Sequence, residues 1–172
     1  MNKIVCCLLG YALLMSGCAS GGARSRAANH LLDFTSKEAS PNPDQSQVIS
    51  IAKGLLGTPY HFGGTNPDDG FDCSGYVAYV FKQAVRLSLP RQTNEQIKTG
   101  RAVSSSLQPA DMVYFKMSEQ NSWHTGIYIG KQKFIHAPSS NGVVNIQEMN
   151  LPYWNKRFFG ARRLLEDYDP KE

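Results

Sequence analysis

Cysteine is scarce over most of this 172-residue sequence. Of the four cysteines, Cys6, Cys7 and Cys18 all lie within the first 18 positions. Only Cys73 lies beyond them, so the chain after residue 18 has no second cysteine with which to close an internal disulfide. A small fold held together by disulfides is therefore excluded there, and Cys73 is the thiol left for chemistry.

Strong charge and long hydrophobic runs are also lacking. Charged residues make up 19% of the chain, and the formal net charge is only +4, with the basic residues dispersed. This balance, without a basic helix or an RNA-binding motif, argues against a nucleic-acid partner. The apolar run at residues 4–14 is shorter than the roughly 20 residues that span a bilayer.

The N-terminus instead has the features of an export signal. A short basic start precedes the apolar run, which ends in Leu14-Met15-Ser16-Gly17-Cys18, a segment that resembles a bacterial lipobox. We expect residues 1–17 to be a lipoprotein signal peptide and Cys18 to carry fatty acyl chains such as palmitate, which together anchor stably. The alternative is an ordinary secretory signal peptide. The residue after the cysteine is Ala19 and not the aspartate that is associated with inner-membrane retention in enteric bacteria. We therefore expect the protein to lie in the bacterial cell envelope, anchored in the outer membrane and facing the periplasm.

Composition divides the rest of the chain into three parts. Residues 18–46 are small and polar and predict a lipidated flexible tether. Residues 47–165 form one domain of about 120 residues, enough for a single core. Residues 166–172 are acidic and predict a frayed tail. We expect a monomer.

Periodicity predicts helices first and strands afterwards. Helical spacing begins near Val48 and ends before Gly57, and a second helix covers residues 73–85. Thr93 and Gln96 match a capping box at the start of a short third helix. Strand candidates follow at 111–115, 124–130, 133–137, 142–147 and 158–164. This order predicts an α+β fold, with N-terminal helices packed on a mainly antiparallel sheet of five or six strands.

Cys73 stands at the start of the second predicted helix. It shares a helical stripe with Val77 and Val80, so its thiol faces the core from the first turn, with Asp72 available as N-cap. The partial positive charge of a helix start favours the thiolate, which suits a nucleophile. The alternative is a small buried hydrophobe.

Two histidines lie on a predicted β-hairpin. A three-residue loop at 130–132 pairs Ile135 with Ile127 and places His124 and His136 on the other face, diagonally about 7–8 Å apart. A thiol, a base and a group that orients the base would make a Cys-His-His arrangement, with a thiolate–imidazolium pair at neutral pH. Each histidine alone is also typical of a structural residue. A zinc site is the other alternative, but no close ligand pair favours it, and we expect neither metal nor cofactor.

Several further segments resemble the NlpC family of bacterial cell-wall cysteine peptidases, in particular its lipoprotein type. The resemblance covers roughly residues 46 to 165 and implies a papain-like fold. It departs from the family at Ala110, where glycine is usual, and at His61-Phe62, which replaces a commoner aromatic pair. The matching segments are Gly57–Gly64, Gly70–Val77, Leu89–Arg91, Pro109–Phe115, His124–Gly130, Phe134–Ala137, Tyr153-Trp154 and Phe159–Arg163.

The resemblance implies roles for the residues that match. It makes Cys73 the nucleophile, His124 the general base and His136 the group that orients His124. It implies further that Tyr60 and the Cys73 backbone N–H help to hold the oxyanion.

Two residues that flank the nucleophile also match the family. By analogy, Asp72 and Ser74 contact the charged ends of a stem peptide, although a helix N-cap and a first-turn hydroxyl are the plainer interpretations. The resemblance thus implies a peptidoglycan endopeptidase that cleaves stem peptides or cross-links. A wall-binding lipoprotein without activity, and an amidase or acyltransferase on the same scaffold, are the alternatives.

Overall fold

The computed structural model describes residues 40–118, 120, 122–139 and 142–165. The expected signal peptide, Cys18, the acidic tail and most of the expected tether lie outside this range. No helix among the described residues is both long and apolar enough to cross a membrane. The elements are α1 (Pro43–Gly54), β1 (Thr65–Asn66), β2 (Gly70–Phe71), α2 (Cys73–Val85), α3 (Thr93–Gln96), β3 (Arg101–Val103), β4 (Met112–Lys116), β5 (Trp123–Gly130), β6 (Lys133–His136), β7 (Asn145–Glu148), α4 (Pro152–Asn155) and β8 (Phe158–Arg163).

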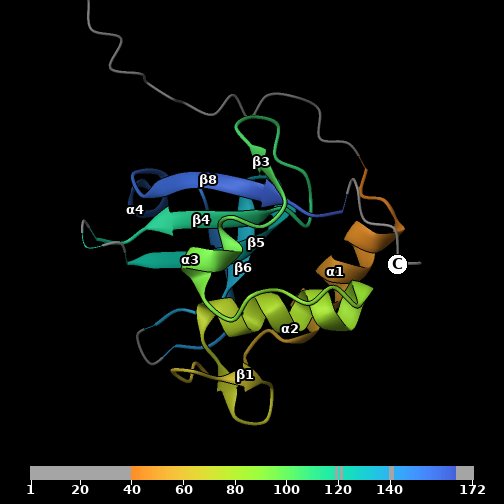
Figure 1. The fold of residues 1–172 in the computed structure, drawn as a ribbon. Helices are drawn as coiled ribbons and strands as arrows, with labels where there is room; N and C mark the ends of the chain where they lie inside the picture. Colours follow the sequence, from red (N-terminus) through yellow and green to blue (C-terminus); the bar gives the residue numbers. More distant parts are fainter. Residues whose placement is uncertain (1–39, 119, 121, 140–141, 166–172) are drawn as a thin grey trace, which may run out of the picture. The chain divides into compact units, whose positions relative to one another are not determined.

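Six strands form one sheet in the order β3-β8-β4-β5-β6-β7, and every neighbouring pair is antiparallel (Figure 1). The strands β1 and β2 form a separate small hairpin. The helices α1 and α2 precede the sheet in sequence. The predicted α+β fold is confirmed.

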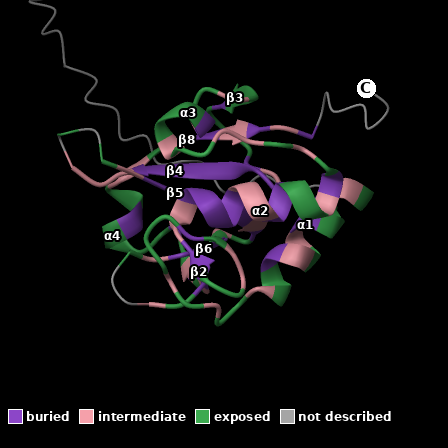
Figure 2. Cartoon of the chain, turned by 60° about the horizontal axis from the view of Figure 1, so that its bottom comes forward, coloured by how far each residue is buried: buried purple, intermediate pink, exposed green. Residues whose placement is uncertain are grey.

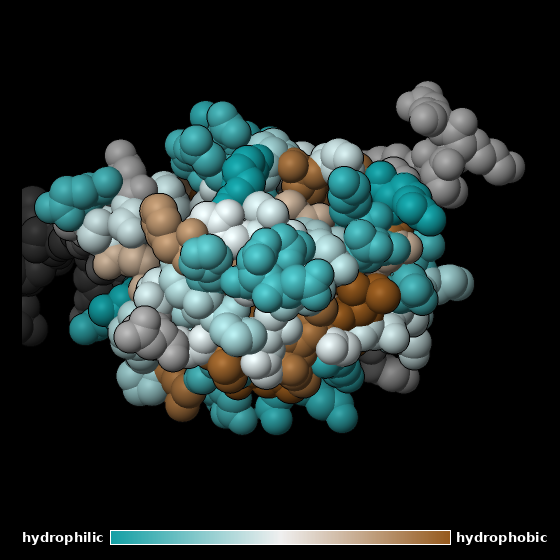
Figure 3. All heavy atoms as spheres, turned by 90° about the horizontal axis from the view of Figure 1, so that it is seen from below, coloured by the Kyte–Doolittle hydropathy of each residue, from teal (hydrophilic) through white to brown (hydrophobic). Residues whose placement is uncertain are grey.

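The sheet is buried on both faces because successive side chains of a strand point in opposite directions. On one face, Ile127 and Ile135 belong to the core that α1 and α2 cover. On the other face, Phe115 and Phe134 pack against Trp154 of α4. Burial is therefore highest along β4, β5 and the inner side of α2 (Figure 2). On the face seen from below, hydrophobic side chains lie in small groups between hydrophilic ones (Figure 3).

The first helix begins earlier than predicted. The tether was expected to run to residue 46, but α1 begins at Pro43. Asn42 and Gln45 form a capping box, with bonds of 2.8 and 2.9 Å between each side chain and the other residue's backbone N–H. A proline suits the first helical position because it has no N–H to satisfy there, so the sequence Pro41-Asn42-Pro43 starts a helix.

The second helix covers Cys73–Val85, as predicted, and Asp72 is its N-cap. The Asp72 carboxylate accepts the Gly75 N–H at 2.7 Å. Gly75 lies so close to the preceding turn that an added Cβ would stand 2.1 Å from the Gly64 carbonyl oxygen. This close approach fixes the first turn of α2, and with it Cys73, against the 61–72 segment.

The predicted capping box at the third helix is wrong. Gln92 is the N-cap of α3, and Thr93 lies in its first turn. Gln96 does not reach back to the helix start because its buried amide donates to the carbonyl oxygens of Ser74 and Pro90, at 3.0 and 2.8 Å. Gln96 thus ties α3 to α2, and the Thr93 hydroxyl lies 3.7 Å from the Cys73 sulfur.

The hairpin of β5 and β6 has the predicted register, with Ile127 opposite Ile135. Gly126 is required in this hairpin because its neighbours leave no room for a side chain. A Cβ at this position would stand 2.8 Å from the Phe134 ring and 3.2 Å from the His136 Cβ, so those side chains occupy the space.

Candidate active site

Cys73 opens into a groove of about 840 Å³. The first turn of α2, the 60–63 segment, the start of α3 and the start of β5 all contribute to it. The groove brings together five of the residues singled out from the sequence, while His136 lies behind His124. Its lining includes Tyr60, Phe62, Asp72, Cys73, Ser74, Arg91, Trp123 and His124.

His124 and His136 form a buried pair. Nε2 of His124 lies 2.7 Å from Nδ1 of His136, and the two rings are perpendicular, at 89°. This bond leaves Nδ1 of His124 outside the pair. Trp154 stacks on the His124 ring at 5.6 Å and meets the His136 ring edge-on at 5.1 Å. The orientation of His124 is thus fixed by His136 and Trp154.

The role of His124 as a base determines the tautomers of the pair. If Nδ1 of His124 is to accept a proton, Nε2 must carry the hydrogen and donate it to His136. His136 then carries its own hydrogen on Nε2, which has no hydrogen-bond partner among the described residues. Asn145 lies opposite His136 in the β6–β7 ladder, with its side-chain amide close to that nitrogen.

Burial dominates the electrostatics of the site. It lowers the pKa of His124 to about 3, with a further contribution from His136. It lowers the pKa of His136 to about 4, although the Asn145 amide acts in the opposite direction. Burial also raises the pKa of the Cys73 thiol, which the Thr93 hydroxyl only partly offsets.

Burial therefore opposes the expected thiolate–imidazolium pair. The helix start was expected to lower the pKa of Cys73, but the sulfur is largely buried and the Asp72 carboxylate raises its pKa further. Burial favours the thiol of Cys73 and the neutral imidazole of His124. A neutral imidazole that shares the groove with the thiol can take its proton during attack.

Asp72 is engaged by Arg91, a residue that the sequence reasoning did not single out. The guanidinium binds the carboxylate through two bonds of 2.6 and 3.0 Å, and also donates to the Ser74 hydroxyl at 3.0 Å. Burial alone would raise the pKa of Asp72, but Arg91 and the Gly75 N–H hold it below its usual range. The sequence did hold a signal for Arg91, because Leu89-Pro90-Arg91 is one of the segments that resemble the family.

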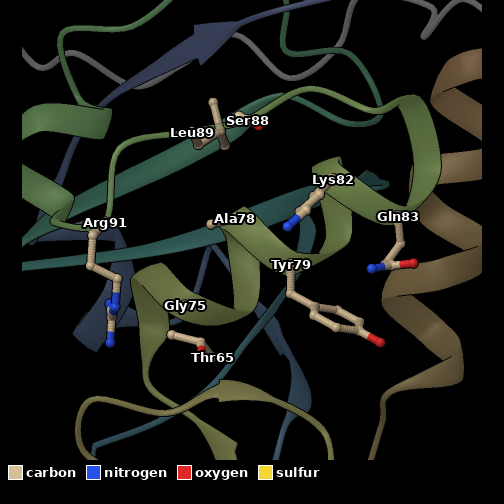
Figure 4. Close-up of a pocket in the computed structure, with 9 residues that line it drawn as sticks. All are labelled: Thr65, Gly75, Ala78, Tyr79, Lys82, Gln83, Ser88, Leu89 and Arg91. Carbon is tan, nitrogen blue, oxygen red and sulfur yellow. The ribbon is translucent and has the colours of Figure 1, made fainter.

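Arg91 also borders a second cavity, of about 400 Å³, along α2. Tyr79, Lys82 and Gln83 of α2 contribute to its lining, and Leu89 comes from the segment after the helix (Figure 4). Because the Cys73 groove and this cavity share Arg91, that side chain lies at the boundary between them.

Tyr60 is half-buried in the Cys73 groove. Burial, and next the charge that Cys73 would carry as a thiolate, raise the pKa of its phenol. Its hydroxyl therefore keeps its hydrogen at neutral pH and can donate a hydrogen bond. The backbone N–H groups of Thr125 and Ser74 also point toward the sulfur and favour its charged form.

The geometry of the two histidines does not favour the zinc alternative. Their facing nitrogens are 2.7 Å apart and bonded to each other. Two nitrogen ligands at zinc-ligand distance from a tetrahedral ion would lie about 3.3 Å apart. No group of three or more histidine, cysteine or acidic side chains placed to hold a metal occurs in the described part of the chain.

The sequence of this chain also matches known proteins. The NlpC/P60 family model matches residues 57–163. The murein DD-endopeptidase MepS/murein LD-carboxypeptidase of Escherichia coli K12 is 33% identical over 171 residues, covering 91% of this chain and 89% of that protein. The probable endopeptidase NlpC of the same strain is 37% identical over 168 residues, covering 92% and 98%. The gamma-DL-glutamyl hydrolase of Bacillus subtilis 168 is 39% identical over 136 residues, 78% of this chain but only 33% of that protein.

A solved structure agrees with these matches. An NlpC/P60 family protein from Bacillus cereus ATCC 10987 superimposes with a TM-score of 0.65 at 34% identity, over 72% of this chain and 41% of that one. The family model, two relatives matched over most of their length and the shared fold lead to one conclusion. This chain belongs to the NlpC/P60 family.

Proposed function

We propose that this protein is a peptidoglycan endopeptidase that hydrolyses peptide bonds of cell-wall stem peptides or their cross-links through Cys73. The observation that carries the proposal is the shared groove of Cys73 and His124, with His136 bonded to His124 at 2.7 Å. Membership of a family of peptidoglycan hydrolases supports the substrate class. A relative named as a murein DD-endopeptidase and another named as a probable endopeptidase, both matched over most of their length, support it as well.

The proposed reaction begins at the thiol. As the Cys73 sulfur attacks the scissile carbonyl carbon, Nδ1 of His124 takes the thiol proton, and Tyr60 donates a hydrogen bond to the developing oxyanion. His124 then gives that proton to the departing nitrogen, which leaves as a free amine, and a thioester remains on Cys73. Water next attacks the thioester while His124 takes a proton from it. The carboxylic acid leaves, and the proton returns to the sulfur.

His136 keeps His124 in this orientation by accepting its Nε2 hydrogen. At the other end of the groove, Asp72, Ser74 and Arg91 form a hydrogen-bonded cluster beside the sulfur. We assign this cluster to the charged end of the acyl half of the substrate. The Asp72 carboxylate binds an ammonium group of the substrate there, and the 43% exposed Arg91 guanidinium binds a carboxylate of the substrate.

Hydrolysis of a defined, cross-linked muropeptide in water enriched in ¹⁸O tests the proposal. Because water attacks the thioester, one ¹⁸O atom should enter the new carboxylate, and mass spectrometry of the fragments identifies the cleaved bond. An acyltransferase would instead yield a product joined to an added amine, without ¹⁸O. A binding protein would return the muropeptide uncut.

We further propose that Cys18 is lipidated and anchors the protein in the outer membrane. The lipobox-like segment 14–18 and the following Ala19 support this proposal. The polar chain between Cys18 and α1 supports it too, since it lets the domain reach peptidoglycan from the membrane. Cys18→Ser should abolish labelling with a radioactive fatty acid and release the protein from membranes. Recovery of the mature wild-type protein in inner-membrane vesicles would contradict the sorting proposal and leave the enzymology untouched.

A further inference from the structure

The groove does not stop at His124. A third cavity, of about 350 Å³, adjoins the Cys73 groove and shares three of its lining residues, Met117, His124 and Ser139. This adjoining cavity lies on the side of the histidine pair, away from the Asp72–Arg91 cluster, neither residue of which lines it. Its own lining comes mainly from β6, β7 and α4 and includes His136, Asn145, Gln147, Leu151, Tyr153 and Trp154.

One wall of the adjoining cavity is apolar. Trp154 is almost buried against both catalytic histidines, whereas Leu151 and Tyr153 are 42% and 49% exposed. Hydrophobic side chains left this open at the rim of a cavity suit contact with an aliphatic ligand.

The other wall is polar and neutral. Asn145 and Gln147 each use one amide N–H within the protein, toward the Val143 carbonyl and the Asn145 side-chain oxygen, at 2.9 and 3.1 Å. An amide nitrogen carries two hydrogens, so each has one more to offer. Behind them lies the buried Nε2 of His136, whose hydrogen has no partner in the described structure. Among the residues that the structure describes, no aspartate, glutamate, lysine or arginine lines this cavity.

The proposed reaction determines which half of the substrate extends toward the adjoining cavity. The acyl half of the substrate stays on Cys73 and extends toward the Asp72–Arg91 cluster. The departing nitrogen must lie beside His124, because His124 supplies its proton. The amine half therefore extends from His124 away from that cluster, toward the adjoining cavity.

We propose that the adjoining cavity is the subsite for the amine-side residue of the cleaved bond. Its occupant is an amino-acid residue with an aliphatic portion and a carboxylate or amide oxygen next to the departing nitrogen. Leu151 and Trp154 contact the aliphatic portion, and the amides of Asn145 and Gln147 donate to the oxygen. This assignment rests on the proposed function and adds to it the residues that select the leaving group.

Two substrates with the same acyl half separate this subsite from the catalytic machinery. One carries an amino acid as leaving group, as in a cross-linked muropeptide, and the other carries only methylamine. Leu151→Trp fills the cavity, so it should lower the kcat/KM ratio of the first substrate to the second by about tenfold or more. Ile146→Trp is the matched control, since Ile146 is 40% exposed on the same strand as Gln147 but outside the cavity, and should change the ratio less than about twofold.

Gln147→Leu supplies a second measurement that does not depend on how Leu151→Trp folds. Loss of its amide donor should lower the same ratio by about threefold to tenfold. An unchanged ratio in every variant that melts like the wild type would overturn the subsite. A wild-type protein that cleaves neither substrate would contradict the proposed function, and the subsite with it.

Discussion

Two aspartate–arginine pairs of the same chemistry serve this fold in different ways. In both, a guanidinium binds a carboxylate through two bonds, and the carboxylate also accepts a backbone N–H. Arg91 and Asp72 are 43% and 14% exposed at the groove, whereas Arg163 and Asp111 are 7% and 1% exposed in the interior. The comparison indicates that burial separates a pair that holds the fold together from one that is left accessible to the proposed substrate.

The interior pair connects distant segments. Arg163, at the end of β8, binds Asp111 at 2.7 and 2.8 Å and also donates to the Ser106 carbonyl at 3.1 Å. Asp111 in turn accepts the Gln108 N–H at 2.8 Å. The pair thus fixes the entry to β4 against β8. The groove pair, by contrast, joins Arg91 and the Gly63 backbone to the first turn of α2, and its guanidinium remains exposed.

The largest expected effect is that of Arg163→Met. Removing one partner of a buried pair leaves a charge without compensation, and we expect the free energy of unfolding to fall by about 3–5 kcal/mol. Urea denaturation followed by circular dichroism measures this change. A loss below about 1 kcal/mol would break the comparison, because the interior pair would then resemble an exposed one.

As pH falls, the protein should lose stability first through protonation of the two histidines and only later through protonation of Asp72. His124 and His136 have folded pKa values of about 3 and 4, below the unfolded value of 6.5. The unfolded chain therefore binds protons first, and stability is lost as pH falls from 6.5 toward 4. The pKa of Asp72 is itself lowered from 3.8, so its contribution is lost only at still lower pH.

Melting temperatures at pH 7 and pH 4.5 test this order. We expect the wild type to lose at least about 5 °C more over this interval than the double variant His124→Gln, His136→Gln. Equal losses in the two proteins would show that the histidines are not held neutral by burial.

Arg91→Met should sharpen the comparison from the other side. Because the groove pair is partly exposed, we expect the free energy of unfolding to change by less than about 1 kcal/mol. We expect kcat/KM on a muropeptide to fall about tenfold, mainly through KM, since a binding contact is lost. Lys53→Met is a control, because Lys53 is exposed on α1 and lines neither the Cys73 groove nor the adjoining cavity. Wild-type kinetics in Arg91→Met would show that Arg91 does not bind the substrate.

The smallest effect concerns Ala110, which directly precedes Asp111. Its φ of 72° lies in the left-handed region, which explains why the family usually has glycine there. Ala110→Gly should therefore raise the free energy of unfolding by about 0.5–1 kcal/mol. A destabilised variant would mean that the Ala110 methyl group, in the main core, contributes more than the strain costs.

Local patterns in the sequence predicted much of this structure. Helical spacing and the Asp72 cap gave the bounds of α2, and the facing isoleucines of β5 and β6 gave the register that places the two histidines on one face. These signals lie within about a dozen residues of one another, where periodicity is informative.

The features that the sequence did not predict depend on contacts between distant segments. Arg91 reaches Asp72 across 19 positions, and the Trp154 ring contacts His124 across 30 positions. The pKa of Cys73 was predicted in the wrong direction because its degree of burial depends on the packing of α2 and α3 against β5. The helix that carries Trp154 had a usable signal in Pro152, at its first position.

The most direct test of the central claim is the kcat/KM of Cys73→Ser on a defined, cross-linked muropeptide. We expect a loss of at least about a thousandfold, at an unchanged melting temperature, because a serine hydroxyl does not replace the thiol as nucleophile. Cleavage by Cys73→Ser within about tenfold of the wild-type rate would contradict the assignment of Cys73, His124 and His136 as the catalytic unit.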